Sequence, residues 1–113
     1  QTYGEQHPEV ANMRVALARS LLAIGDADSR TEAGKLIDQA LPVLEKARAG
    51  TADRGVALLV RAELRLDAGD AMGAQRDIDA ALPSLQGKGL DRERERRMAA
   101  NLSQRIKRMP AIR

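Results

Sequence analysis

The sequence predicts an all-α fold, and three observations lead there. Residues with a strong intrinsic preference for helices, chiefly Ala, Leu, Arg, Glu, Lys and Gln, dominate the 113-residue chain. Aromatic residues, which are enriched in strands, are limited to one Tyr, with no Phe and no Trp. Apolar residues also recur at intervals of three and four, and the segments that carry this spacing belong to an internal repeat. Helices packed on helices are therefore expected.

The amino-acid composition limits the classes of protein to which the chain can belong. The chain is 43% apolar and 31% charged, the balance of one globular domain. It has no cysteine, so a disulfide framework and a thiolate metal site are both excluded. No apolar stretch approaches the roughly 20 residues that a membrane-spanning helix needs. We expect no membrane insertion of this segment.

A block of eight residues occurs twice. Residues 37–44 read Ile-Asp-Gln-Ala-Leu-Pro-Val-Leu and residues 78–85 read Ile-Asp-Ala-Ala-Leu-Pro-Ser-Leu, so six of eight positions are identical at a spacing of 41. Upstream, residues 18–26 match 62–70 at a spacing of 44. The two spacings differ by three residues, because the first copy has three extra residues in the turn after its Gly-Asp pair. We expect two copies of one unit, repeat one over about 8–49 and repeat two over about 51–87.

Each copy predicts two helices. The first helix of repeat one begins at Pro8, where a proline loses no intrahelical hydrogen bond, and it ends at Gly25. The second is expected to begin at Ser29, acting as its cap. Pro42 lies inside this second helix, so a bend or an end is expected there and at the equivalent Pro83. The apolar stripe of the second helix comprises Ala33, Leu36, Ile37, Ala40, Leu41, Leu44 and Ala47.

Repeat two follows the same plan. Thr51 is expected to cap its first helix, which runs to Gly69, and its second helix runs from Asp70 toward Gly87. A fifth helix is predicted over about residues 91–109. Its first two turns are charged, and its apolar positions are Met98, Ala99, Leu102 and Ile106. Because only its second half has a face to bury, we expect it to cap the two repeats.

On these residues the chain resembles the tetratricopeptide repeat family, in the longer variant of about 42 residues that occurs in kinesin light chain-like proteins. The small and turn positions of the motif fall on Ala18, Gly25, Ala33, Ile37 and Ala40 in copy one, and on Ala62, Gly69, Ala74, Ile78 and Ala81 in copy two. The resemblance implies an α-solenoid of two antiparallel helical hairpins plus a C-terminal capping helix. Arg61 and Arg65 depart from the motif, which buries apolar residues there, and they predict looser packing in copy two.

The N-terminal residues suggest a longer context. Tyr3-Gly4 and His7-Pro8-Glu9 are similar to the link that precedes such a repeat, and the numbering begins at Gln1. We expect the chain to be a fragment of a larger bacterial protein, or the open end of repeat one to be covered by a second copy in a homo-oligomer. The sequence does not fix the compartment, and the cytoplasm is favoured over the periplasm.

Catalytic, cofactor-binding and metal-binding residues are not indicated. His7, the only histidine, lies next to Pro8 and is interpreted as a cap or link residue. Asp26-Ala27-Asp28 resembles the start of a calcium loop, but the glycine and the final carboxylate of such a loop are missing. Neither a phosphate-binding glycine loop nor a nucleophile elbow occurs. The sequence therefore predicts a protein that is not an enzyme and uses no cofactor.

Basic residues concentrate near the C-terminus. Residues 86–113 hold 9 of the 19 Lys and Arg residues but only 3 of the 16 Asp and Glu residues. Such clusters attract phosphate. Over residues 91–97, however, arginines alternate with acids, which is typical of a solvated helix, and aromatic residues that could stack on bases are lacking. We expect no specific nucleic-acid binding.

What remains is a binding surface. The resemblance implies a concave groove lined by the first helices of successive repeats, and it assigns to this groove Asn12, Val15, Arg19, Leu22, Val56, Leu59, Glu63, Leu66 and Arg96. Arg19 and Glu63 have matching positions one repeat apart, and we expect them to pair. The leading hypothesis is a non-enzymatic scaffold that binds a protein, peptide or helix. The alternative is a regulatory or sensory segment of a larger signalling enzyme or transcription regulator.

Overall fold

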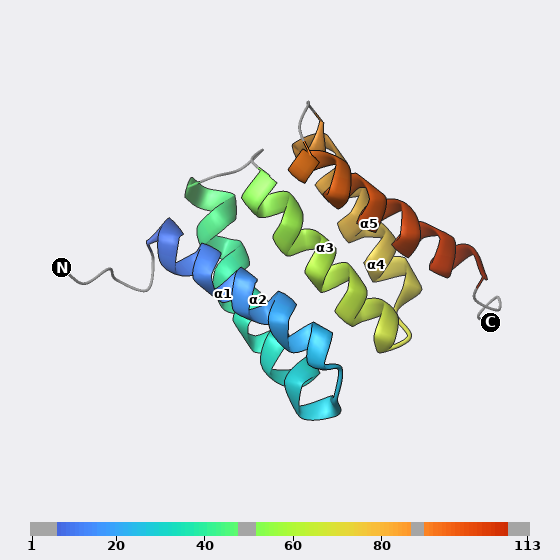
Figure 1. Ribbon diagram of the computed structural model, residues 1–113, viewed down its shortest axis with the longest axis horizontal. Helices are drawn as coiled ribbons and strands as arrows, with labels where there is room; N and C mark the ends of the chain where they lie inside the picture. The colour runs from blue at the N-terminus through green and yellow to red at the C-terminus, as the bar shows by residue number, and fades with distance from the viewer. Residues whose placement is uncertain (1–6, 48–51, 87–89, 109–113) are drawn as a thin grey trace.

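Five α-helices make up the molecule (Figure 1), a computed structural model that describes residues 7–47, 52–86 and 90–108. They are α1 (Pro8–Ile24), α2 (Ala27–Ala47), α3 (Ala52–Asp67), α4 (Ala71–Ala81) and α5 (Leu90–Arg108). A short 3-10 helix, η1 (Leu82–Leu85), continues α4. No strand occurs within the described residues. The all-α prediction is confirmed.

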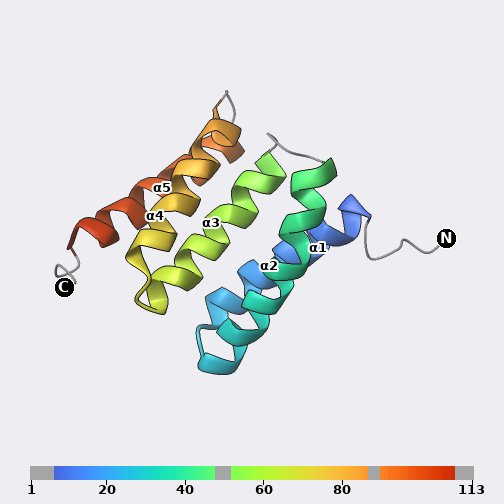
Figure 2. The same cartoon turned by 180° about the vertical axis from the view of Figure 1, so that it is seen from behind.

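The helices form two hairpins side by side, followed by a single helix. α1 packs along α2, α3 packs along α4, and α5 lies against α3, α4 and η1. The front of the molecule in Figure 1 shows α1, α3 and α5, whereas the reverse view in Figure 2 brings α2 and α4 forward. The molecule therefore has two layers, with α1, α3 and α5 in one layer and α2 and α4 in the other.

Local signals set the two ends of α1. His7 caps it, because its Nδ1 accepts a hydrogen bond of 3.1 Å from the backbone N–H of Glu9. This confirms His7 as a cap residue. Gly25 ends the helix in the left-handed conformation at φ 85°, where a side chain would be strained. Both bounds agree with the sequence prediction.

The start of α2 differs from the prediction. Asp26, not Ser29, acts as the cap, since its carboxylate accepts a hydrogen bond of 2.7 Å from the backbone N–H of Ser29. This hydrogen bond is the leading reason why the pKa of Asp26 is lowered. The predicted start was wrong because Ser29 was taken as the cap, although an aspartate three residues earlier is as good a cap as a serine. The corresponding cap in hairpin two is Asp70, which accepts from the backbone N–H of Gly73 at 2.8 Å.

The two equivalent prolines have different outcomes. α2 continues through Pro42 to Ala47, whereas α4 stops at Ala81 and Pro83 lies in η1. Hairpin two therefore has the shorter second helix. Gly55 on α3 allows η1 to approach closely, because a Cβ at this position would lie only 3.1 Å from side-chain atoms of Ser84 and Leu85. The caps expected at Thr51 and Gly87 lie outside the described residues.

One continuous apolar core joins the hairpins and α5. Its largest fully buried side chains are Ile37, Leu44, Leu58, Leu59, Val60, Ile78 and Leu85. Alanines at the helix contacts, such as Ala18, Ala40, Ala62 and Ala81, are 0% exposed. Small residues at these contacts let the helix axes approach closely, so the core needs no aromatic side chain. From α5, Ala99 and Leu102 join this core, which places the inner face of the capping helix where the sequence predicted it.

Candidate functional site

The layer formed by α1, α3 and α5 carries an open cavity of about 220 Å³. The three helices contribute to it in turn, α3 lying between the other two. Its walls are Arg19, Leu22, Ala23, Val60, Glu63 and Met98. Apolar side chains thus form much of the wall, with one cation and one carboxylate at the rim.

A second cavity of about 300 Å³ adjoins the first between α3 and α5. Glu63 and Met98 line both, so the two cavities form one groove, which we call the α1–α3–α5 groove. The remaining walls of the second cavity are Arg94, Arg97, Asn101, Leu102 and Arg105. The α5 side of the groove is therefore basic.

Charged side chains cross the groove from helix to helix. Arg19 on α1 lies 3.9 Å from an oxygen of Glu95 on α5, and Arg105 on α5 donates a hydrogen bond of 3.0 Å to Asp67 on α3. Arg19 and Glu63 line the same cavity but form no ion pair within the described residues, so the predicted pairing was wrong. The reason is geometric: the Arg19 side chain extends past α3 to the buried carboxylate of Glu95.

Glu95 is buried with one oxygen unused. Glu95 is 4% exposed, and its Oε2 has no hydrogen-bond partner in the part of the chain that the structure describes. A buried carboxylate oxygen without a donor costs free energy, of the order of 1–3 kcal/mol for an unsatisfied polar group. The contacts of Arg19 and Arg94 with Glu95, both at 3.9 Å, are too long to be hydrogen bonds. Glu95 is therefore an incompletely satisfied carboxylate beneath the groove, and it is not part of the groove wall.

Glu63 lies at the centre of the groove and is half-buried. Burial raises its pKa from the ordinary value of 4.5, and the neighbouring Asp67 adds to the shift, while Arg105 opposes it. The structure gives Glu63 no ion pair or hydrogen bond among the described residues. Its carboxylate is thus an acceptor facing the groove.

Replacing Glu63 by glutamine is expected to raise the free energy of unfolding at pH 7. Because burial favours the neutral acid, the folded chain binds this proton more tightly than the unfolded chain, and stability falls as the pH rises from about 4.5 through the raised folded pKa. The variant loses this component of the pH dependence. Urea unfolding at several pH values between 4.5 and 7 measures it, with the exposed Glu32→Gln as control. Identical pH slopes for wild type and Glu63→Gln would contradict the prediction.

Seven of the nine residues predicted for the groove divide into two groups. Arg19, Leu22 and Glu63 line it. Val15, Leu59 and Leu66 lie in the core, at 5%, 0% and 6% exposure, and Val56 packs against that core. Helical spacing places these four on apolar faces but does not tell a groove wall from a core contact.

The two remaining predicted residues join elements of the fold. Asn12 donates a hydrogen bond of 3.1 Å to Asp53, which links the first hairpin to the first turn of α3. Arg96 donates one of 2.7 Å to the carbonyl oxygen of Leu85, at the end of η1. Both side chains thus have structural contacts in this molecule.

Comparison with family models, curated proteins and solved structures finds no match to this chain. Within the described residues no helix has the length and apolar character to cross a membrane. The same part of the chain brings together no group of three His, Asp or Glu side chains that could hold a metal ion.

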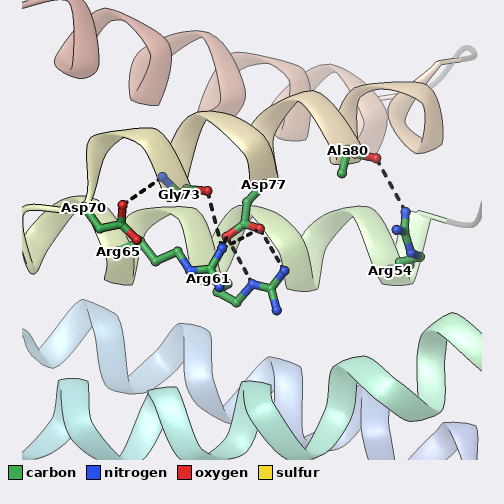
Figure 3. Close-up of polar contacts among 7 residues, drawn as sticks. All are labelled: Arg54, Arg61, Arg65, Asp70, Gly73, Asp77 and Ala80. Carbon is green, nitrogen blue, oxygen red and sulfur yellow. Dashed lines mark hydrogen bonds and ion pairs between the residues drawn. The ribbon is translucent and has the colours of Figure 1, made fainter.

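A charged cluster inside hairpin two, formed by Arg61, Arg65 and Asp77, was not predicted from the sequence (Figure 3). Arg61 on α3 donates two hydrogen bonds to Asp77 on α4, at 2.8 and 3.1 Å, and Arg65 donates to the same carboxylate at 3.1 Å. Asp77 is only 3% exposed. Its hydrogen bonds are the main reason why the pKa of Arg61 is raised, against the opposing effect of burial. The arginines thus do not loosen the second hairpin but connect its two helices.

The internal repeat contains a signal for this cluster. At the repeat spacings, Arg61, Arg65 and Asp77 correspond to Leu17, Leu21 and Leu36 of the first copy. Three leucines are thus replaced together by two cations and one anion. Because the two cations and the anion of copy two balance each other and all replace leucines of copy one, their joint replacement predicts that the three charged side chains contact each other.

Proposed function

We propose that the chain is a non-enzymatic, tetratricopeptide-like module that binds a helix or extended peptide of a partner protein in the α1–α3–α5 groove. The observation that carries this proposal is the pair of adjoining cavities, of about 220 and 300 Å³, lined by side chains from three successive helices of one layer. A continuous groove across several helices suits a chain segment better than a compact small molecule. The two helical hairpins with a closing α5 support the family resemblance at the level of architecture.

The chemistry of the groove describes the partner segment. Leu22 and Met98 offer apolar contacts, so the segment carries an apolar anchor. The carboxylate of Glu63, which lines both cavities, favours a cationic side chain beside that anchor. Arginines on the α5 side favour acidic groups farther along the segment. The partner is therefore an amphipathic segment with charges of both signs.

The groove has a modest area, so affinity depends on a few anchors. Interfaces of about 800 Å² per partner range from micromolar to picomolar dissociation constants. Because the two adjoining cavities on this face are small, we expect the affinity of this module to be at the weak end of that range. A module of this kind gains affinity when it is joined to others in tandem.

A selection of random peptides on the 113-residue chain, followed by NMR titration of the strongest binder, tests the proposal. We expect amide shifts at α1 residues 19–23, α3 residues 60–63 and α5 residues 94–105. Arg19→Glu and Glu63→Lys are each expected to weaken binding by about tenfold or more, equivalent to about 1.4 kcal/mol. Because Glu63 is half-buried and Arg19 contacts the buried Glu95, circular dichroism and urea unfolding check that both variants are folded before binding is compared.

Arg76→Glu is the matched control, because Arg76 is an exposed cation on α4, in the other layer. It should bind the peptide as the wild type does. Amide shifts concentrated on α2 and α4, or equal affinities for Arg19→Glu, Glu63→Lys and Arg76→Glu, would exclude the groove as the binding site.

A further inference from the structure

Helix α1 has a second apolar face that no part of the described chain covers. Of the five large apolar side chains that are exposed in the structure, three belong to this helix: Met13 at 68%, Leu17 at 50% and Ile24 at 65%. They lie on the side of α1 opposite to Ala11, Val15 and Ala18, which are buried against the rest of the molecule. A helix that is apolar on two opposite faces is typically covered on both.

The exposed face has the spacing of a helix-packing surface. Val10, Met13, Leu17, Ser20 and Ile24 follow one another at intervals of three, four, three and four. This is the heptad spacing by which one helix packs against another. We call these five residues the α1 seam. Val10 is half-buried and Ser20 is exposed, so the seam is open along its length.

The second hairpin shows what covers the equivalent face. At the repeat spacing of 44, the counterparts of Leu17, Ser20 and Ile24 are Arg61 and Leu64 on α3 and Ala68 directly after its end. These three residues face helix α2, since they line one cavity of about 210 Å³ together with α2 residues such as Gly34 and Ile37. In the second hairpin, therefore, a helix packs against the face that corresponds to the α1 seam.

We propose that the α1 seam is the interface of a homodimer, in which α1 of one protomer packs antiparallel on α1 of its partner around a two-fold axis at Leu17. In this register Leu17 meets its own copy, and Val10 lies opposite Ile24 of the partner subunit, since each is seven residues from the axis. Met13 is four residues before the axis and the partner's Ser20 is three residues after it, so the large and the small side chain lie within one residue, about 1.5 Å along the helix, of facing each other. Such alternation fills space without voids.

Two further features favour this arrangement. Antiparallel α1 helices place the positive end of each helix dipole beside the negative end of the other. A head-to-tail contact would need a second apolar surface at the other end of the molecule. Among the residues of α5 whose exposure the structure describes, the exposed ones that do not line the groove are, apart from Ala100, polar or charged: Glu93, Gln104, Lys107 and Arg108. The contact is therefore isologous and closes at two copies.

The seam and the groove are separate faces of α1. The groove is lined from α1 by Arg19, Leu22 and Ala23, none of which belongs to the seam. Dimerisation would leave the groove of each protomer open and double the number of grooves per particle. The proposal therefore does not depend on the binding function of the groove.

Sedimentation equilibrium of the 113-residue chain, up to about 1 mM, tests the dimer. We expect the wild type to dimerise and Leu17→Glu to be monomeric, because the substitution brings two carboxylates together on the two-fold axis. Met72→Glu is the matched control: Met72 is 74% exposed on α4, away from the seam, and this variant should dimerise as the wild type does. Circular dichroism checks that all three are folded.

Cysteine cross-linking gives an independent measurement, because the chain has no cysteine of its own. Under mild oxidation Leu17→Cys should form a disulfide-linked dimer rapidly, since the axis places the two sulfurs together, whereas Met72→Cys should remain monomeric on a reducing-agent-free gel. A monomeric wild type at the highest concentration would overturn the proposal. So would a dimer unaffected by Leu17→Glu, or equal cross-linking at Leu17→Cys and Met72→Cys.

Discussion

Replacing Asp77 by alanine is expected to lower the free energy of unfolding by about 2–4 kcal/mol, a large part of the roughly 5–15 kcal/mol typical of a small domain. The carboxylate accepts hydrogen bonds from both Arg61 and Arg65 and is 3% exposed, so its removal leaves two cations side by side without their anion. The cost stays below that of breaking a fully buried pair, because the two arginine side chains are 28% and 35% exposed and can reach water. Chemical denaturation monitored by circular dichroism measures it.

A neighbouring aspartate provides the control. Asp79 is exposed on α4 and accepts a hydrogen bond only from Gln75, four residues away on the same helix. Asp79→Ala should therefore change the free energy of unfolding by no more than about 0.5 kcal/mol. If Asp77→Ala and Asp79→Ala cost the same, the charged cluster contributes no stability to hairpin two.

The first hairpin suggests a rescue of Asp77→Ala. It has leucines at all three equivalent positions, so the triple variant Arg61→Leu, Arg65→Leu, Asp77→Leu converts the second hairpin to the arrangement of the first. Because replacing a buried ionic cluster by packed apolar residues is commonly neutral or stabilising, we expect the triple variant to be at least as stable as the wild type. A triple variant less stable than Asp77→Ala would show that the leucines cannot pack in hairpin two.

The sequence predicted the helices of this protein well, because the signals that place them are local. The Pro8 start and the Gly25 stop of α1 agree with the structure, and so does the inward face of α5. The start of α2 was missed because Asp26 and Ser29 are both good caps and lie three residues apart. Propensity alone does not choose between two such caps.

The candidate site was less predictable, since it depends on which helix faces which. Apolar spacing marks the faces of a helix but does not tell a core contact from a groove wall. Leu22 and Leu59 were assigned to the same groove, yet Leu22 lines the groove and Leu59 is fully buried. The contact of Arg19 with Glu95 joins residues 76 positions apart, which no local pattern indicates.

Replacing Leu59 by alanine tests this distinction between core and groove. Leu59 is 0% exposed in a core continuous across the hairpins, so the deletion leaves a cavity and should lower the free energy of unfolding by about 2–5 kcal/mol. Met72→Ala removes a side chain that is 74% exposed and should cost no more than about 0.5 kcal/mol. Urea unfolding of both variants and the wild type measures the difference.

The same variant separates stability from binding. If Leu59 acts through the core, the folded fraction of Leu59→Ala binds a groove peptide with nearly wild-type affinity, and the apparent loss follows the unfolded population. If Leu59 instead touches the partner, affinity falls while stability stays at the wild-type value. The second outcome would require α3 to rotate on binding so that a fully buried side chain reaches the groove. Because close-packed cores resist such rotation, we expect the first outcome.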